Sequence, residues 1–144
     1  VYFSEVFQEK GGFDVVIGNP PYIRIQELQK SDPKQVRYFK DKYTSASKGN
    51  YDIYVVFIEK GLRLLNKRGY QSYILPHKFF NAKYGEPVRE LISKGKHLSK
   101  IVHFGDQQIF EGASTYVCLL FLNRSSSEQF EFQSVVDVHA WMRS

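Results

Sequence analysis

The ten residues FDVVIGNPPY, at positions 13–22, constrain the fold of this chain more than any other part of its sequence. Val15, Val16 and Ile17 form a short apolar run that follows two glycines and is ended by two prolines. This pattern is typical of a strand buried on both faces inside a parallel sheet. In open α/β sheets, ligands bind at the carboxyl ends of the strands. The loop after the strand is therefore a candidate catalytic site, made of Asn19, Pro20, Pro21 and Tyr22.

The chemical groups of this loop suit a planar amino group as substrate. The nitrogen of such a group, on a nucleobase or an amide, is a poor nucleophile because its lone pair is delocalised. Two acceptors that bind both N–H groups would localise the lone pair, and Asn19 Oδ1 and the Pro20 carbonyl are two such acceptors. The prolines fix φ and have no N–H, which keeps the carbonyl pointing outwards. The Tyr22 ring can then stack on a flat substrate. In the alternative interpretation, the prolines only end a core strand and Tyr22 packs locally.

The run resembles motif IV of the S-adenosylmethionine-dependent amino-methyltransferases, and Asn-Pro-Pro-Tyr is the form typical of N6-adenine DNA methyltransferases. The resemblance implies an α/β fold that forms the C-terminal half of a Rossmann-like methyltransferase sheet. Such a sheet is mostly parallel with one antiparallel strand, and helices pack on it. The chain looks closest to the type IIG, or Eco57I-like, restriction-modification enzymes.

Later segments resemble further motifs of the same family in the expected order. Residues 51–54 (YDIY), the helix that follows and the strand at 69–76 (GYQSYILP) look like motifs V and VI. Residues 105–115 look like motif VIII, where the family places an aromatic ring on the other face of the flipped base, and Phe110 is the matching position. Alternatively, Phe110 only fills the core beside Ile109.

Local signals predict the remaining elements. Ser31, Asp32 and Pro33 predict the cap and first turn of a helix. Apolar spacing predicts a second helix over residues 52–66, closed by Lys67, Arg68 and Gly69, and a third between residues 85 and 95. Residues 1–10 form a short amphipathic segment, and residues 99–105 and 115–123 are two further strands. We expect residues 1–123 to be a partial methyltransferase catalytic domain and residues 124–144 to be a tail or the start of a linker.

The charge of the chain is concentrated in its middle. Residues 24–50 carry a net charge of +4 and residues 51–100 of +6, whereas residues 1–23 carry −2 and residues 101–144 carry −3. Such a field favours a polyanion and fits nucleic acid, although ordinary solubility explains any single lysine equally well. His77 is a weaker candidate at the end of its strand, because this chemistry requires no base. The candidate DNA contacts are Arg24, Lys30, Lys34, Arg37, Lys40, Lys42 and Lys48.

The resemblance implies S-adenosylmethionine as the cofactor, with Asn19 beside it. The family's glycine-rich cofactor loop and acidic residue would both precede Phe13, so we expect this chain alone to bind the cofactor weakly and to be inactive. The implied partners are double-stranded DNA, an N-terminal half of the catalytic domain and a target-recognition domain, and whether a nuclease is attached stays open. The edge of the strand at residues 15–17 also makes a homo-oligomer plausible.

The cysteine and histidine content of the chain indicates its redox compartment and whether it could bind a metal. Cys118 is the single cysteine, so no disulfide can form within the chain and a reducing cytoplasm is the simplest setting. The four histidines show no metal-ligand spacing with Cys118, and we predict no metal site and no membrane segment.

We therefore expect a site-specific adenine DNA methyltransferase of a restriction-modification system. It would transfer a methyl group from S-adenosylmethionine to N6 of an adenine flipped out of the duplex, because that nitrogen cannot meet the donor inside the stack. One alternative is another amino-methyltransferase with the same motif, acting on protein glutamine or on rRNA guanine. The other is a non-catalytic DNA-binding fragment.

Overall fold

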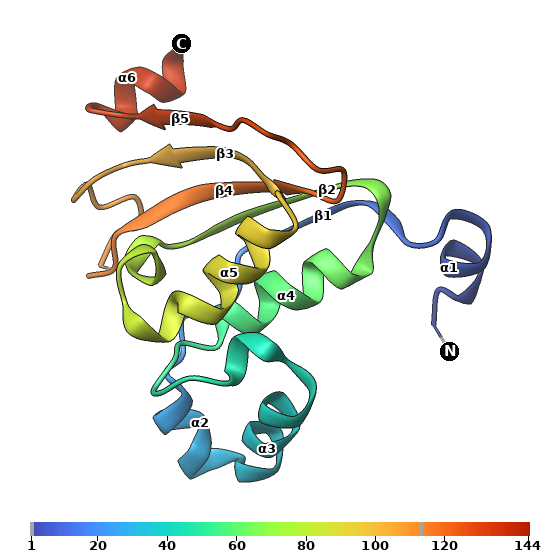
Figure 1. The fold of residues 1–144 in the computed structure, drawn as a ribbon. Helices are drawn as coiled ribbons and strands as arrows, with labels where there is room; N and C mark the ends of the chain where they lie inside the picture. Colours follow the sequence, from blue (N-terminus) through green and yellow to red (C-terminus); the bar gives the residue numbers. More distant parts are fainter. Residues whose placement is uncertain (1, 113) are drawn as a thin grey trace.

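The computed structural model describes residues 2–112 and 114–144. Val1, at the start of the expected amphipathic segment, and Ala113, inside the expected motif VIII segment, lie outside the described residues. Five strands form one sheet in the order β1-β2-β4-β3-β5 (Figure 1). They are β1 (Phe13–Gly18), β2 (Leu65–Pro76), β3 (Leu98–His103), β4 (Val117–Asn123) and β5 (Glu131–Ser134).

The strand directions confirm the predicted fold class. Strand β1 is parallel to β2 and β3 is parallel to β5, whereas β4 lies antiparallel between β2 and β3. One antiparallel ladder joins β3 to β4, which are consecutive along the chain, and the other joins β2 to β4, which are not. The result is a mostly parallel α/β sheet with one antiparallel strand.

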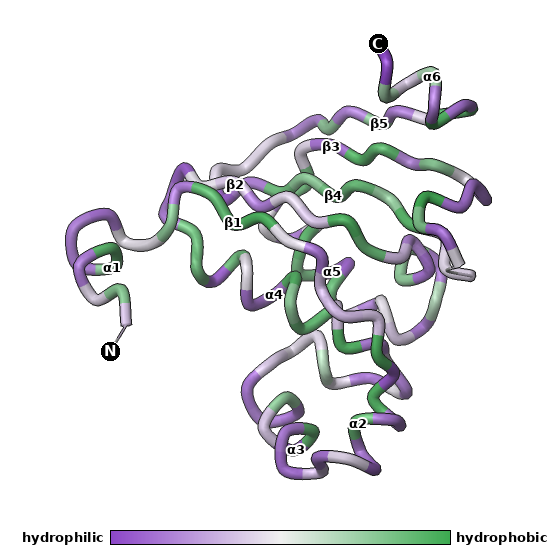
Figure 2. Tube along the Cα trace, turned by 180° about the vertical axis from the view of Figure 1, so that it is seen from behind, coloured by the Kyte–Doolittle hydropathy of each residue, from purple (hydrophilic) through white to green (hydrophobic). Residues whose placement is uncertain are grey.

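Helices α4 and α5 lie on one side of the sheet, and α2 and α3 lie beyond them (Figures 1 and 2). Helices α1 and α6 lie at opposite ends of the molecule in both views. Three short 3-10 turns complete the described elements. The bounds are α1 (Ser4–Lys10), α2 (Ile25–Ser31), α3 (Pro33–Lys42), η1 (Thr44–Ala46), α4 (Tyr54–Leu64), η2 (His77–Phe80), η3 (Lys83–Gly85), α5 (Glu86–Lys94) and α6 (Val138–Arg143).

The core has two parts because side chains alternate across the sheet. On β4, Leu120 and Leu122 belong to the larger cluster beneath α4 and α5, whereas Leu119 and Phe121 face the other side and join a smaller cluster. Trp141 of α6 packs against that smaller cluster. The second face is therefore covered near β3 and β4 but not near β1.

Strand β1 corrects one expectation, because it is not buried on both faces. Val15 is 59% exposed and Ile17 is 79% exposed. Strand β1 is the edge of the sheet, and α4 and α5 cover only the face to which Val16 contributes. The apolar run thus gave the right element but the wrong environment within the described chain.

The end of the second predicted helix is also corrected. Helix α4 ends at Leu64 rather than near residue 66, and Gly69 lies inside β2 instead of capping the helix. The Arg124 side chain donates hydrogen bonds to the carbonyls of Leu62 and Leu65 at 3.0 and 3.1 Å, which satisfies the helix end from a distant part of the chain. Gly69 has a different role, because a Cβ there would lie 2.7 Å from the carbonyl oxygen of Phe13.

The basic segment after the motif IV loop is held to the body of the protein by buried polar contacts. As predicted, Asp32 caps α3, and its Oδ1 accepts from the backbone N–H of Gln35 at 3.0 Å. Glu59 of α4 is 1% exposed and accepts from the backbone N–H of Ser45 at 2.8 Å and of Thr44 at 3.3 Å.

None of the helices in the described parts of the chain is both long and apolar enough to cross a membrane.

Candidate active site

The motif IV loop leaves the carboxyl end of β1 immediately after Gly18. Gly18 is the last residue of the parallel ladder with β2, where it pairs with Tyr73. Asn19 is exposed, Pro20 is buried and Tyr22 is half-buried. The loop therefore presents Asn19 to solvent at the strand end, whereas Pro20 is buried and the outward direction of its carbonyl stays a prediction.

Tyr22 connects this loop to the interior. Its ring packs against both hydrophobic clusters, and its hydroxyl donates to Asn19 Oδ1 at 2.6 Å. The carbonyl oxygen of Ile74 on β2 lies 3.3 Å from the same hydroxyl. Burial, and to a lesser extent Cys118, raise the pKa of Tyr22 to about 12, so the hydroxyl stays protonated at neutral pH.

A cleft of about 670 Å³ opens beside Tyr22 at the carboxyl ends of β1 and β2. Tyr22 is the member of the Asn-Pro-Pro-Tyr motif that lines it directly. Polar groups reach it from several segments far apart in sequence, which is typical of a ligand site. Among the residues that line it are Arg24, Asp52, Pro76, His77, Lys78, Asn81, Thr115 and Tyr116.

Asp52 is held in this cleft by a chain of hydroxyl groups. Tyr84 donates to Asp52 Oδ2 at 2.9 Å, and the hydroxyls of Tyr84 and Tyr54 lie 2.8 Å apart. Burial raises the pKa of Tyr84 to about 12 and that of Tyr54 further, so both stay neutral. Arg24 and Asp52 are joined by a backbone bridge, flanked by a 2.9 Å hydrogen bond from the Ile53 N–H to the Ile23 carbonyl. The start of the basic segment is thereby fixed to the wall of the cleft.

His77 lines the same cleft and lies among other rings. Its ring centroid is 4.4 Å from that of His103, and its plane lies within 11° of the Tyr116 ring at 6.4 Å. Burial, followed by the charge of His77, lowers the pKa of His103, and its Nδ1 accepts from the Gly105 N–H at 3.0 Å. His77 is thus a wall residue of the cleft, and its proposed functional role stays a prediction.

The seven predicted DNA contacts are spread over the basic segment rather than gathered at the cleft. Arg24 lines the cleft, whereas Lys30 and Lys40 line a separate hollow between α2 and α3. Lys48 forms an ion pair with Glu86 that lowers the pKa of that carboxyl. Lys34, Arg37 and Lys42 are exposed. Lys78, which the sequence reasoning did not select, lines the cleft and adds a second cation beside Arg24.

Phe110 lies on the loop between β3 and β4 and is 37% exposed. It is not among the residues that line the cleft, so its role in stacking stays a prediction. The loop is held from behind by Gln107, whose side chain bonds to the carbonyl of Phe104 and to the N–H of Val138 at 3.0 Å each. No periodicity or motif marks Gln107, because its partners are backbone atoms.

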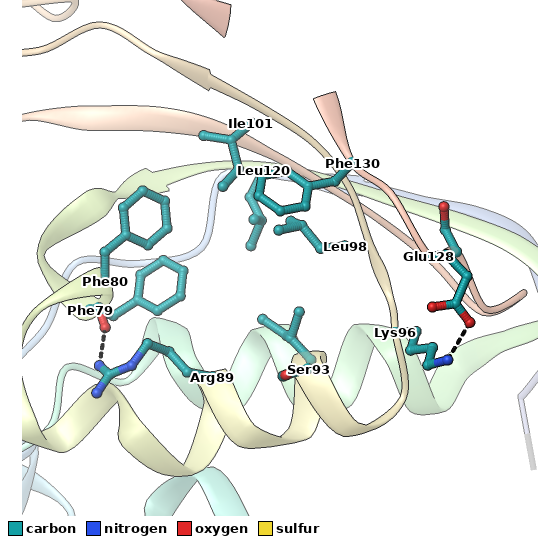
Figure 3. A pocket seen from close by; sticks show the side chains of 12 residues that line it. Phe79, Phe80, Arg89, Ser93, Lys96, Leu98, Ile101, Leu120, Glu128 and Phe130 are labelled. Atoms are coloured by element: carbon teal, nitrogen blue, oxygen red, sulfur yellow. Dashed lines mark hydrogen bonds and ion pairs between the residues drawn. The ribbon is translucent and has the colours of Figure 1, made fainter. Parts of the chain in front are cut away.

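A second cavity, of about 340 Å³, lies between α5 and the sheet and is lined mainly by apolar side chains. Figure 3 shows Phe79, Phe80 and Leu120 around it, with charged groups at its rim. Those groups are already paired: Arg89 donates to the Phe79 carbonyl at 2.6 Å, and Lys96 forms an ion pair with Glu128. The cleft beside Tyr22 has a more polar lining, which includes Arg24, Lys78 and Asn81, and is the better candidate for chemistry.

Metal chemistry has no ready donor set here. Within residues 2–112 and 114–144, no three His, Cys, Asp or Glu side chains gather into a group that could hold a metal ion. Cys118 is buried, and burial raises its pKa to about 12, so its thiol is a neutral core side chain.

Comparison with known proteins agrees with this geometry. The family model described as Eco57I restriction-modification methylase matches residues 1–110. The type II restriction enzyme and methyltransferase RM.Eco57I of Escherichia coli is 41% identical over 130 residues, which is 90% of this chain and 13% of that protein. The chain thus spans about an eighth of the length of this relative.

Solved structures share the fold at lower identity. A class I S-adenosylmethionine-dependent methyltransferase from Listeria monocytogenes superimposes with a TM-score of 0.63 at 20% identity, over 92% of this chain and 41% of its own. The type ISP restriction-modification enzyme LlaGI, solved with a DNA substrate mimic, gives 0.61 at 18% identity, over 89% of this chain and 15% of its own. The match over residues 1–110 is what establishes membership: this chain belongs to the Eco57I restriction-modification methylase family.

Proposed function

We propose that the complete protein is a site-specific DNA methyltransferase of a restriction-modification system that methylates adenine at N6. The observation that carries the proposal is the position of Asn19, which is exposed at the carboxyl end of β1 and tied to Tyr22 at the edge of an open polar cleft. The chain belongs to a family of restriction-modification methylases, and Asn19 Oδ1 is a hydrogen-bond acceptor in a position where it could bind the amino group of a base.

The residues of this chain would act on the amino group rather than on the methyl donor. Asn19 Oδ1 and the Pro20 carbonyl accept its two N–H groups, which localises the lone pair on nitrogen. Methylation of this nitrogen would release one of its N–H protons, which would leave to water through the open cleft. Tyr22 and Phe110 stack on the two faces of the extruded base, which replaces part of the stacking lost from the duplex.

S-adenosylmethionine fits the site only in part. When bound, it supplies an electrophilic methyl group, and Asn19 is the residue of this chain that would lie beside it. The free edge of β1 and the exposed Val15 and Ile17 fit the addition of further strands and helices there. Residues outside this chain would complete the cofactor site on that side. In the isolated chain the same edge is a surface for self-association.

Double-stranded DNA is the proposed substrate. The basic middle of the chain supports this, because Arg24 and Lys78 line the cleft and α3 carries further exposed cations. A target-recognition domain elsewhere in the protein would select the sequence, and residues 124–144 would lead towards it. A protein of this kind acts in the cytoplasm, where its DNA is.

The experiment is methyl transfer by the complete protein, using a labelled donor and duplex DNA, with the methylated nucleoside identified by mass spectrometry. We expect N6-methyladenine, and we expect Asn19→Ala to lower turnover by a hundredfold or more while DNA affinity is retained. Asn50→Ala, an exposed amide in the basic segment, is the matched control and should keep full turnover. Wild-type turnover in Asn19→Ala would refute the role of Asn19. Methylated protein or RNA in place of DNA would support the other amino-methyltransferases, and no transfer at all would support a DNA-binding fragment.

A further inference from the structure

The Tyr22 hydroxyl is placed to control which end of the Asn19 side chain faces a substrate. The phenol ring packs against both hydrophobic clusters, and its oxygen lies 2.6 Å from Asn19 Oδ1. Asn19 itself is exposed, and the Tyr22 hydroxyl is the side-chain partner that holds its amide. The rigid partner in this pair is therefore the tyrosine.

The two ends of an amide are similar in size but opposite in hydrogen bonding. The Oδ1 end accepts the N–H of an amino group, whereas the Nδ2 end is a donor and would repel it. A separation of 2.6 Å is short for an N–H···O bond but ordinary for an O–H···O bond, so the contact fits the hydroxyl donating to Oδ1. The raised pKa of Tyr22 keeps that proton on the phenol. Since Oδ1 has two lone pairs, one remains for the substrate.

The Ile74 carbonyl is the other acceptor to which the Tyr22 hydroxyl could donate. It lies 3.3 Å from the Tyr22 hydroxyl, which is the longer of the two contacts. If the phenol donated to the Ile74 carbonyl, its oxygen would accept from the Asn19 amide nitrogen. Nδ2 would then take the place that Oδ1 holds beside Tyr22, and it would meet the amino group of the substrate with a donor. The shorter contact to Asn19 favours the first arrangement.

We propose that Tyr22 is a positioning residue, whose hydroxyl orients the Asn19 amide so that its oxygen can receive the amino group of the substrate. This role rests on the proposed methyltransferase function and adds to it, since stacking uses the ring of Tyr22 and orientation uses only the hydroxyl. The two roles separate experimentally. Tyr22→Phe keeps the ring and removes the orienting donor, whereas Tyr22→Leu removes both.

The test is kinetics with the complete protein on duplex DNA. Tyr22→Phe should lower kcat about tenfold, the loss of roughly one hydrogen bond, with KM and DNA affinity unchanged. The fluorescence of 2-aminopurine at the target position should also stay unchanged in Tyr22→Phe but change in Tyr22→Leu, because stacking depends on the ring. Tyr70→Phe is the control, since Tyr70 is 56% exposed on β2 and away from the loop, and it should keep wild-type kcat.

A double-mutant cycle with Asn19→Asp tests orientation itself. A carboxylate has two equivalent oxygens and needs no orienting donor, so Tyr22→Phe should cost less than threefold in single-turnover rate in that background. An equal cost in both backgrounds would overturn the proposal and leave Tyr22 a general structural role. Should Asn19→Asp show no turnover, the comparison of Tyr22→Phe with Tyr70→Phe decides: equal kcat values refute the proposal. Failure of the function itself would be seen separately, as absence of transfer by the wild-type protein.

Discussion

Removal of the Glu59 carboxylate should destabilise the fold by detaching the basic segment from α4. The side chain is 1% exposed and accepts from two backbone N–H groups, those of Ser45 at 2.8 Å and Thr44 at 3.3 Å. It also forms an ion pair with Arg63, whose guanidinium donates to the Lys42 carbonyl at 3.0 Å. One acid therefore holds the whole turn that follows α3.

The magnitude follows from these contacts. A hydrogen bond to a charged group contributes about 1.5 to 3 kcal/mol, and the bond to Ser45 is the shorter and more buried of the two backbone bonds. The ion pair adds less than about 1 kcal/mol, because the Arg63 side chain is half exposed and screened by solvent. Glu59→Ala should thus lower the free energy of unfolding by about 3 kcal/mol. Glu59→Gln retains one acceptor oxygen and should cost about half as much.

Urea denaturation of the chain measures this change directly, as a lower midpoint at unchanged slope. Glu90→Ala is the matched control, since Glu90 is an exposed acid whose pair with Lys94 spans 3.4 Å, and it should cost less than about 0.5 kcal/mol. Limited trypsin digestion should also cut the basic segment faster in Glu59→Ala. If Glu59→Ala and Glu90→Ala have the same stability, the buried contacts do not hold this segment and the reasoning is wrong.

Two further perturbations test packing outside the lining of the cleft. Gly85→Ala should lower the free energy of unfolding, measured by urea denaturation, by about 1 to 3 kcal/mol, because the added Cβ would clash with the Phe79 carbonyl oxygen. Gly18→Ala should cost clearly less, because the nearest neighbour of its Cβ would lie at an ordinary 3.5 Å. Equal losses would contradict the steric argument. The lowered pKa of His103 means that the folded state favours the neutral ring, so its contribution to stability is present above the unfolded pKa of about 6.5 and is lost as the pH falls below it. Between pH 7 and 5, His103→Gln should therefore lose less stability than the wild type. If stability depends on pH in that variant as steeply as in the wild type, His103 does not carry the effect.

Elements set by local sequence were predicted correctly. The glycines and prolines around residues 13–22 bound β1, and Asp32 with Pro33 starts α3, because each of these signals acts within a few residues. The single antiparallel strand in a mostly parallel sheet followed from the family resemblance. The exposure of Val15 and Ile17 could not be predicted, since burial depends on what covers a strand and the same apolar run serves an inner or an edge strand.

Contacts between side chains and distant backbone atoms could not be predicted from the sequence, for a different reason. Arg124 ends α4, Glu59 holds the turn at Ser45, and Gln107 holds the loop of Phe110. Every residue offers a backbone N–H or carbonyl, so such partners leave no pattern in the sequence, and only the folded chain shows which ones meet.

The pair formed by Asn19 and Tyr22 lies between these two cases. Both residues belong to the motif, and the sequence predicted an acceptor in one and a ring in the other. What it did not show is that the hydroxyl of Tyr22 reaches the amide three residues earlier. Pro20 and Pro21 lie between the two residues, and because their rings fix φ, they restrict the backbone that joins Asn19 to Tyr22. It follows that replacing either proline should disturb Asn19 through Tyr22, even where the strand and the cleft are unchanged.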